Sequence, residues 1–103
     1  MTDIDLGLTH VALPVTDPDA SVAFYERYAA MKVVHRRRDE AAATSVVWLS
    51  DLTRPFVIVL VEAERVDGRL AGFAHLGVAC ESRDEVDRRG AEARAEGLSL
   101  IHI

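Results

Sequence analysis

Two histidines occupy the same position in two similar eight-residue segments. The segments are LTHVALPV, residues 8–15, and FAHLGVAC, residues 73–80, and their histidines are His10 and His75. A stretch with the signals of a capped helix follows each segment. A neutral imidazole is a good ligand for a divalent ion, and two imidazoles with one carboxylate leave coordination positions open for a substrate. The pair therefore predicts a metal site, and the alternative is two hydrogen-bonded core histidines.

Strand geometry predicts that both histidines lie on the same kind of face. Side chains alternate along a strand, so His10 shares a face with Ala12, while Val11 belongs to the opposite, aliphatic face. The second segment repeats this pattern, with His75 beside Gly77. Because the aliphatic faces must cover helices, the histidines point to the other side of the sheet, where small neighbours leave room. If the two units pair about a pseudo-twofold axis, both imidazoles converge on one cavity.

A regular order of elements must position these residues. After the first segment, Asp17 and Pro18 suit a helix start, and apolar residues at helical spacing predict a helix over 18–30. Three β-rich segments with short connections then predict strands that pair antiparallel, at 32–38, 44–49 and 55–61. Beyond the polar connection 62–72, a strand at 73–80 and a helix over 82–97 start the order again, with Ser82 and Glu85 matching a capping box.

This order predicts an α+β fold made of paired βαβββ modules. We expect a single domain over residues 1–103, with module one at about 6–64, a linker at 65–72 and an incomplete, truncated module two at 73–97. The final hexapeptide LSLIHI matches the translation of a transposon end used in sequencing libraries, so we expect residues 98–103 to be a non-native tail. A genuine strand is the alternative, because the hexapeptide has a high β propensity.

Composition narrows the class of protein. The 103 residues suit one small domain, and a net charge of −5 disfavours nucleic acid, which calls for a basic face. No apolar run approaches the roughly 20 residues of a membrane span, and no signal peptide is visible, so we expect a cytoplasmic protein without a membrane partner. The single cysteine, Cys80, fits a reducing compartment and the role of a small buried hydrophobe.

The chain resembles the vicinal oxygen chelate superfamily, which includes glyoxalases, bleomycin- and fosfomycin-resistance proteins, extradiol dioxygenases and methylmalonyl-CoA epimerases. The resemblance rests on the two histidine segments and on the helix segment DPDASVAFYERYAAM, and it covers nearly all of residues 8–97. It implies a cup of paired modules around a divalent ion of iron, manganese, zinc or nickel, with His10 and His75 as ligands. It also implies a small-molecule substrate and a homodimer of the full-length protein.

The third metal ligand implied by the resemblance has no clear counterpart. Glyoxalase I members carry a ligand glutamate on the last strand of module one, where this chain has Val59. Glu62 and Glu64 follow past the expected strand end, where solvated connection residues are the better interpretation. The pattern of extradiol dioxygenases and fosfomycin-resistance enzymes fits better, with a glutamate on the final strand of module two. We expect this ligand in a missing C-terminal strand, and no activity from the 103-residue chain.

Further candidates concern the substrate pocket. Val57, Val59 and Val61 share a strand face, which would give the cavity an apolar wall suited to an aromatic or alkyl substrate. Trp48 is either a core residue or a further lining residue. The basic segment 33–38 (VVHRRR) is most simply a solvated strand end, with an anionic substrate as the alternative partner for one arginine.

The resemblance implies a metal-dependent enzyme of the lyase, isomerase or dioxygenase type, in which the metal acts as a Lewis acid on two vicinal oxygens of a small substrate. The alternative is a metal-free protein of the bleomycin-resistance type, which binds and sequesters a small molecule in the cup. A third interpretation treats the repeat as structural and the chain as an interaction domain.

Overall fold

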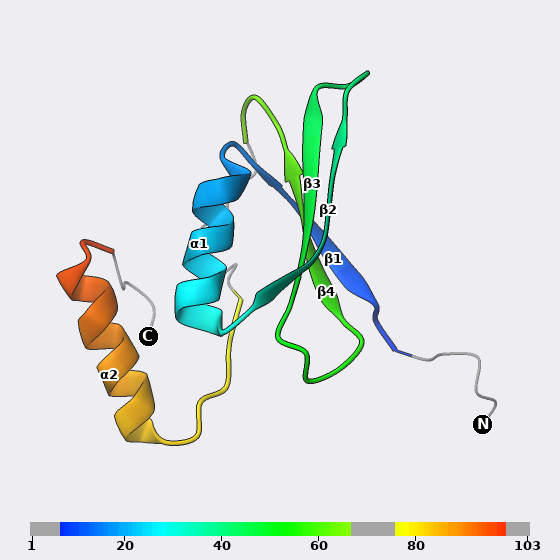
Figure 1. Cartoon of the computed structure of the whole chain (residues 1–103). Coiled ribbons are helices and arrows are strands. Elements are labelled where there is room, and N and C mark those ends of the chain that lie inside the picture. The colour runs from blue at the N-terminus through cyan, green and yellow to red at the C-terminus, as the bar shows by residue number, and fades with distance from the viewer. Residues whose placement is uncertain (1–6, 67–75, 99–103) are drawn as a thin grey trace. The chain divides into compact units, whose positions relative to one another are not determined.

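The computed structural model describes residues 7–66 and 76–98. The chain divides into two compact units between Leu70 and Ala71, and each unit is described by itself. The first unit contains, in order, β1 (His10–Val15), α1 (Pro18–Ala29), β2 (Lys32–Asp39), β3 (Thr44–Ser50) and β4 (Val57–Glu62), and the second contains α2 (Arg83–Ala95) (Figure 1). The predicted α+β class and the βαβββ order of module one are therefore confirmed.

The four strands form one sheet in the order β1-β4-β3-β2. β3 pairs antiparallel with both β2 and β4, as the short connections predicted. β1 instead pairs parallel with β4, from His10 opposite Val57 to Val15 opposite Glu62. Parallel neighbours need a long crossover, which α1, β2 and β3 together provide. The first and last strands of the module thus lie side by side.

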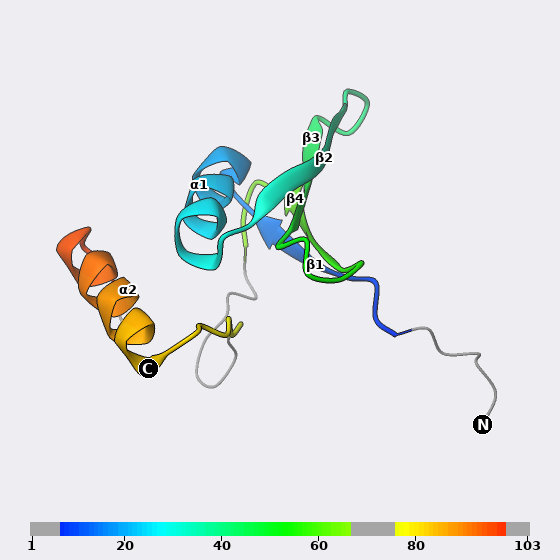
Figure 2. The same cartoon turned by 60° about the horizontal axis from the view of Figure 1, so that its bottom comes forward.

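The hydrophobic core lies between α1 and one face of the sheet (Figures 1 and 2). Val47, Leu49 and Leu60 are fully buried there, and Val22 of α1 packs on them. The aliphatic residues of β1 pack against this cluster, which is the face that strand alternation predicted for them. The opposite face of the sheet carries His10 and is called the open face below.

Local signals fix both ends of α1. The Asp17 side chain accepts a hydrogen bond from the Ala20 N–H at 3.2 Å, and Pro18 takes the first helical position, as predicted. The helix ends at Ala29, one residue before the predicted end, because Ala30 adopts the left-handed conformation with φ of 53°.

A bulge in β2 decides which face its second half presents. Val33 pairs with Leu49 and His35 pairs with Trp48, so Val34 is an extra residue between them. One extra residue moves every later side chain of the strand to the opposite face. His35 therefore lies on the open face beside Trp48.

The second unit contains a capped helix. The Ser82 side chain accepts a hydrogen bond from the Glu85 N–H at 3.2 Å, which fits the predicted cap, and α2 follows from Arg83. Residues 76–80, the described part of the predicted strand 73–80, do not form a strand. A strand exists only as part of a hydrogen-bonded ladder, and none of the described residues pairs with this segment. Cys80, predicted as buried, is only partly covered.

No helix within residues 7–66 and 76–98 combines the length and the apolar character that crossing a membrane requires.

Candidate functional site

A groove of about 560 Å³ lies on the open face of the sheet. Its wall is formed by alternate residues of all four strands and by the β2–β3 turn. The lining residues are Thr9, His10, Ala12, Arg37, Asp39, Ala42, Thr44, Val46, Trp48, Val57, Val59 and Val61. The groove thus brings together His10 and the four residues proposed from sequence for a substrate pocket.

The middle of the groove is apolar because of the strand register. Ala12 lies opposite Val59, and Val59 lies opposite Trp48, so one row crosses three strands. Trp48 is 37% exposed, which places it in the groove wall and not in the core. On its other side the ring of His35 stands 4.8 Å from the Trp48 ring, tilted by 59°. His35, expected in a solvated strand end, packs on the tryptophan.

His10 begins β1 at one edge of the sheet and is exposed in the groove. Its Nδ1 lies 3.0 Å from the Thr9 hydroxyl oxygen, which leaves Nε2 for a further partner. A hydrogen bond at one ring nitrogen orients the other toward a ligand, which is how metal-binding imidazoles are held. His75, the second predicted ligand, lies outside the described residues, so the structure gives no distance between the two histidines.

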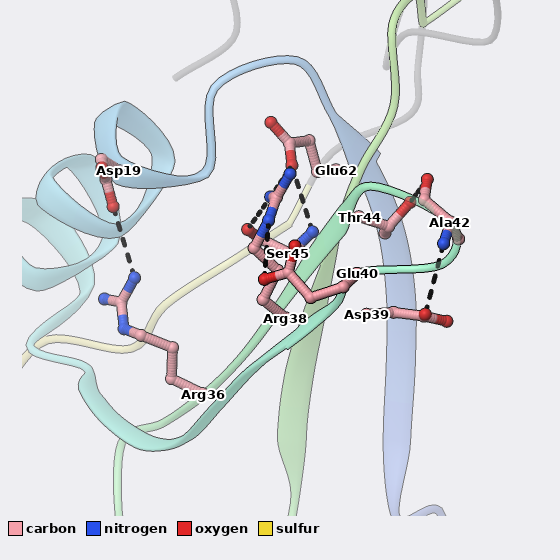
Figure 3. A network of polar contacts seen from close by, with 9 residues as sticks. All are labelled: Asp19, Arg36, Arg38, Asp39, Glu40, Ala42, Thr44, Ser45 and Glu62. Carbon is pink, nitrogen blue, oxygen red and sulfur yellow. Dashed lines mark hydrogen bonds and ion pairs between the residues drawn. The ribbon is translucent and has the colours of Figure 1, made fainter.

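Glu62 was expected in a solvated connection, and the structure corrects this. It is the last residue of β4 and lies on the same face as Leu60, away from the groove. Its Oε1 accepts hydrogen bonds from the Ser45 N–H at 3.1 Å and from Arg38 Nη1 at 3.3 Å (Figure 3). Glu64 is exposed beyond the strand end, as predicted. Glu62 is therefore a structural acceptor of the sheet.

The three arginines of β2 are divided between the two faces. Arg36 pairs with Asp19 of α1 at 3.3 Å and Arg38 pairs with Glu62, both on the helix side (Figure 3). Arg37 lines the groove. Arg36 and Arg38 are exposed, as expected of a solvated strand end, and each also has an ion-pair partner. Sequence alone did not single out Arg37, because the bulge at Val34 that turns it toward the groove has no local signal.

The described residues supply only part of a metal-binding set. No group of three or more His, Cys, Asp or Glu side chains that would hold an ion occurs among residues 7–66 and 76–98. The two residues of such types in the groove wall, His10 and Asp39, lie on β1 and β2, which are opposite edges of the sheet. Of the described residues in the groove wall, His10 could serve as one metal ligand, and these residues do not complete a ligand set.

Comparisons with known proteins identify the family. The sequence profile described as "Glyoxalase/Bleomycin resistance protein/Dioxygenase superfamily" matches residues 7–103, so the chain belongs to this superfamily. The chain is 34% identical over 93 residues to the uncharacterized protein PA2024 of Pseudomonas aeruginosa. This match covers 87% of the chain and 65% of the relative, so the chain spans about two thirds of the curated relative's length.

Solved structures share the fold. The fosfomycin resistance protein FosX of Listeria monocytogenes superposes with a TM-score of 0.74 at 20% identity, over 93% of this chain and 74% of FosX. The trypanothione-dependent glyoxalase I of Leishmania major gives a TM-score of 0.71 at 20% identity, over 96% of this chain and 72% of that enzyme. At these identities the likeness concerns the fold.

Proposed function

We propose that the chain is part of a metal-dependent enzyme that acts on a small substrate with vicinal oxygens, through chemistry of the lyase, isomerase or dioxygenase type. The observation that carries the proposal is the position of His10, which stands at the edge of an apolar groove in a member of this superfamily. His10 and His75 are proposed as two ligands of a divalent ion. FosX, whose fold is similar, has been crystallised with Mn(II).

The third ligand in this proposal is a carboxylate from the final strand of module two, outside the described residues. Support comes from two observations on module one. The position expected for a ligand glutamate is Val59, and the nearest carboxylate along β4, that of Glu62, is bonded to Arg38 and Ser45 on the other face.

When bound, the ion would supply Lewis-acid stabilisation of a negatively charged oxygen. The chain's own residues have three tasks in this proposal. The Thr9 hydroxyl fixes the His10 ring through Nδ1. Val57, Val59 and Val61 present an apolar surface that orients the body of the substrate and keeps water from it. Trp48 adds an aromatic surface for stacking.

Metal binding tests the proposal without an assay of activity. We expect the chain to bind Mn(II) or Zn(II), and His10→Ala, His75→Ala and the double variant each to weaken the affinity by about tenfold or more. His35→Ala is the matched control, because this imidazole packs on Trp48 outside the groove wall. Isothermal titration of the four variants and the wild type measures the effect. Equal metal affinity in the wild type and the double variant would overturn the proposal.

A metal-free binding protein of the bleomycin-resistance type is the second candidate. It is favoured by the apolar middle of the groove. The two candidates differ in one measurement, since ligand binding that is unchanged by EDTA and by the loss of both histidines supports the second.

A further inference from the structure

The side of the groove opposite His10 carries one positive charge. Arg37 lines the groove from β2, and its register partner Val46 lines it from β3. Its neighbours Arg36 and Arg38 point to the helix side, where each has a carboxylate partner. Within the part of the chain that the structure describes, no hydrogen bond or ion pair engages the Arg37 guanidinium.

A guanidinium beside an apolar surface is suited to one kind of ligand. It presents several N–H donors in a plane and binds a carboxylate or phosphonate through two parallel hydrogen bonds. The apolar wall next to Arg37 consists of Val46 and Val61, which are themselves register partners. An apolar ligand body on this wall would lower the local dielectric and so strengthen the ionic contact.

We propose that the groove binds an amphiphilic anion, with its apolar body along the wall between Val59 and Trp48 and its anionic group on Arg37. This inference rests on the proposed function only in treating the groove as the substrate site. It names the class of substrate, an aryl or alkyl carboxylate or phosphonate, which the family assignment leaves open.

Sheet geometry adds a length requirement. Arg37 and His10 lie on opposite edge strands, three strand spacings apart, and the register offsets them by four residues along the strands. Their Cα atoms are therefore about 20 Å apart, and the reach of the two side chains leaves a gap on the order of 10 Å. A three-carbon substrate would be too short to contact both residues. The anionic group must be joined to the reacting end by an extended apolar body.

Asp39 is the opposing charge at this side of the groove. It lies on the same face of β2, two residues after Arg37. Its Oδ1 accepts hydrogen bonds from the Ala41 N–H at 3.1 Å and from the Ala42 N–H at 3.3 Å, the second of which is drawn in Figure 3. These bonds hold the β2–β3 turn and engage the carboxylate. The carboxylate keeps its negative charge, which repels a bound anion. Asp39→Asn should therefore bind the anion more tightly than the wild type.

A matched pair of ligands isolates the charge. Trp48 is the single tryptophan of the chain and lies in the groove wall, so its fluorescence reports binding there. We would titrate the 103-residue chain with 4-phenylbutyrate and with 4-phenylbutan-1-ol, which share the same apolar body, in buffer with EDTA. Arg37→Gln should weaken 4-phenylbutyrate about tenfold and change the alcohol by less than about twofold.

The control is Arg36→Gln, which removes a guanidinium from the helix side and should leave both affinities unchanged. Equal losses for acid and alcohol in Arg37→Gln, no preference of the wild type for the acid, or no binding of either ligand would each overturn the inference. Circular dichroism identifies a variant that fails to fold, and Arg37→Lys then serves as the milder change. Since EDTA is present throughout, the result does not depend on whether His10 binds a metal.

Discussion

Arg38 donates a hydrogen bond through Nη1 to Oε1 of Glu62 at 3.3 Å, and this contact joins β2 to β4 across the intervening β3 (Figure 3). The same carboxylate oxygen accepts the N–H of Ser45 in β3 at 3.1 Å. The Glu62 side chain, itself on β4, therefore bonds to two further strands, β2 and β3, at the end of the sheet that bears the β2–β3 turn. Because Glu62 lies on the helix-side face of β4, its carboxylate bonds to β2 and β3 and does not enter the groove.

Glu62→Ala should lower the free energy of unfolding by about 1 kcal/mol, because it leaves a half-covered N–H and a guanidinium without their acceptor. Urea denaturation measures the loss, and Glu64→Ala, at an exposed position, is the control that should change little. The same variant should keep the metal affinity of the wild type. A large drop in metal affinity would instead make Glu62 a ligand and contradict its structural role.

Truncation of Leu49 tests the core. This residue of β3 has a fully buried side chain in the core between the sheet and α1. Leu49→Ala removes apolar contacts and leaves a cavity, so it should lower the free energy of unfolding by about 2–5 kcal/mol. Leu8→Ala, at a residue that is 85% exposed, should stay within about 0.5 kcal/mol of the wild type. Thermal denaturation followed by circular dichroism compares them. Equal midpoints would contradict the position of the core.

Two neighbouring alanines at the end of α1 should respond to glycine in opposite directions. Ala30 has a φ of 53°, a left-handed conformation that glycine adopts without strain, so Ala30→Gly should stabilise the protein by about 0.5–1 kcal/mol. Ala29 is helical and buried, so Ala29→Gly should destabilise it by about 1 kcal/mol. Chemical denaturation of the pair gives the sign of each change. If both substitutions changed the stability in the same direction, the assignment of the helix end to Ala29 would be contradicted.

The second unit should lose stability in acid through Glu85. Hydrogen bonds from Arg88 and Arg89 hold the pKa of this carboxyl below its ordinary value of 4.5. The stabilisation is therefore complete above the ordinary pKa and is lost as the pH falls through the lower pKa of the folded state. Amide chemical shifts of α2 should report increasing fraying as the pH falls below the ordinary pKa of the carboxyl. Glu85→Gln should abolish most of this pH dependence, and an unchanged profile would contradict the assignment.

Most elements of module one could be predicted because their signals are local. Alternation placed Val11 and Val59 on opposite faces, and Asp17 with Pro18 marked the helix start, so the boundaries differ from the predicted ones by one or two residues. The parallel pairing of β1 with β4 depends on the whole module and has no local signal. Strand formation likewise requires a pairing partner that local sequence does not reveal, so residues 76–80 have the composition of a strand but do not form one in the structure.

The candidate site was only partly visible in the sequence. Residue type and alternation led to His10 and to the valines of β4, which share a face. Arg37 could not be predicted as a groove residue, because the bulge at Val34 reverses the alternation of β2 and no residue type in this segment indicates a bulge. Glu62 was misplaced because a strand end depends on the partner strand, here Val15 of β1.

The parallel ladder between β1 and β4 also sets an order of events in folding. His10 and its partner Val57 are about 47 residues apart in sequence, whereas the β2–β3 and β3–β4 pairs close through short turns. β1 can dock only when β4 is already in place, so the wall of the groove that carries His10 is assembled last. Substitutions on β1 should accordingly accelerate unfolding and leave the folding rate nearly unchanged, whereas those in the β3–β4 hairpin should slow folding.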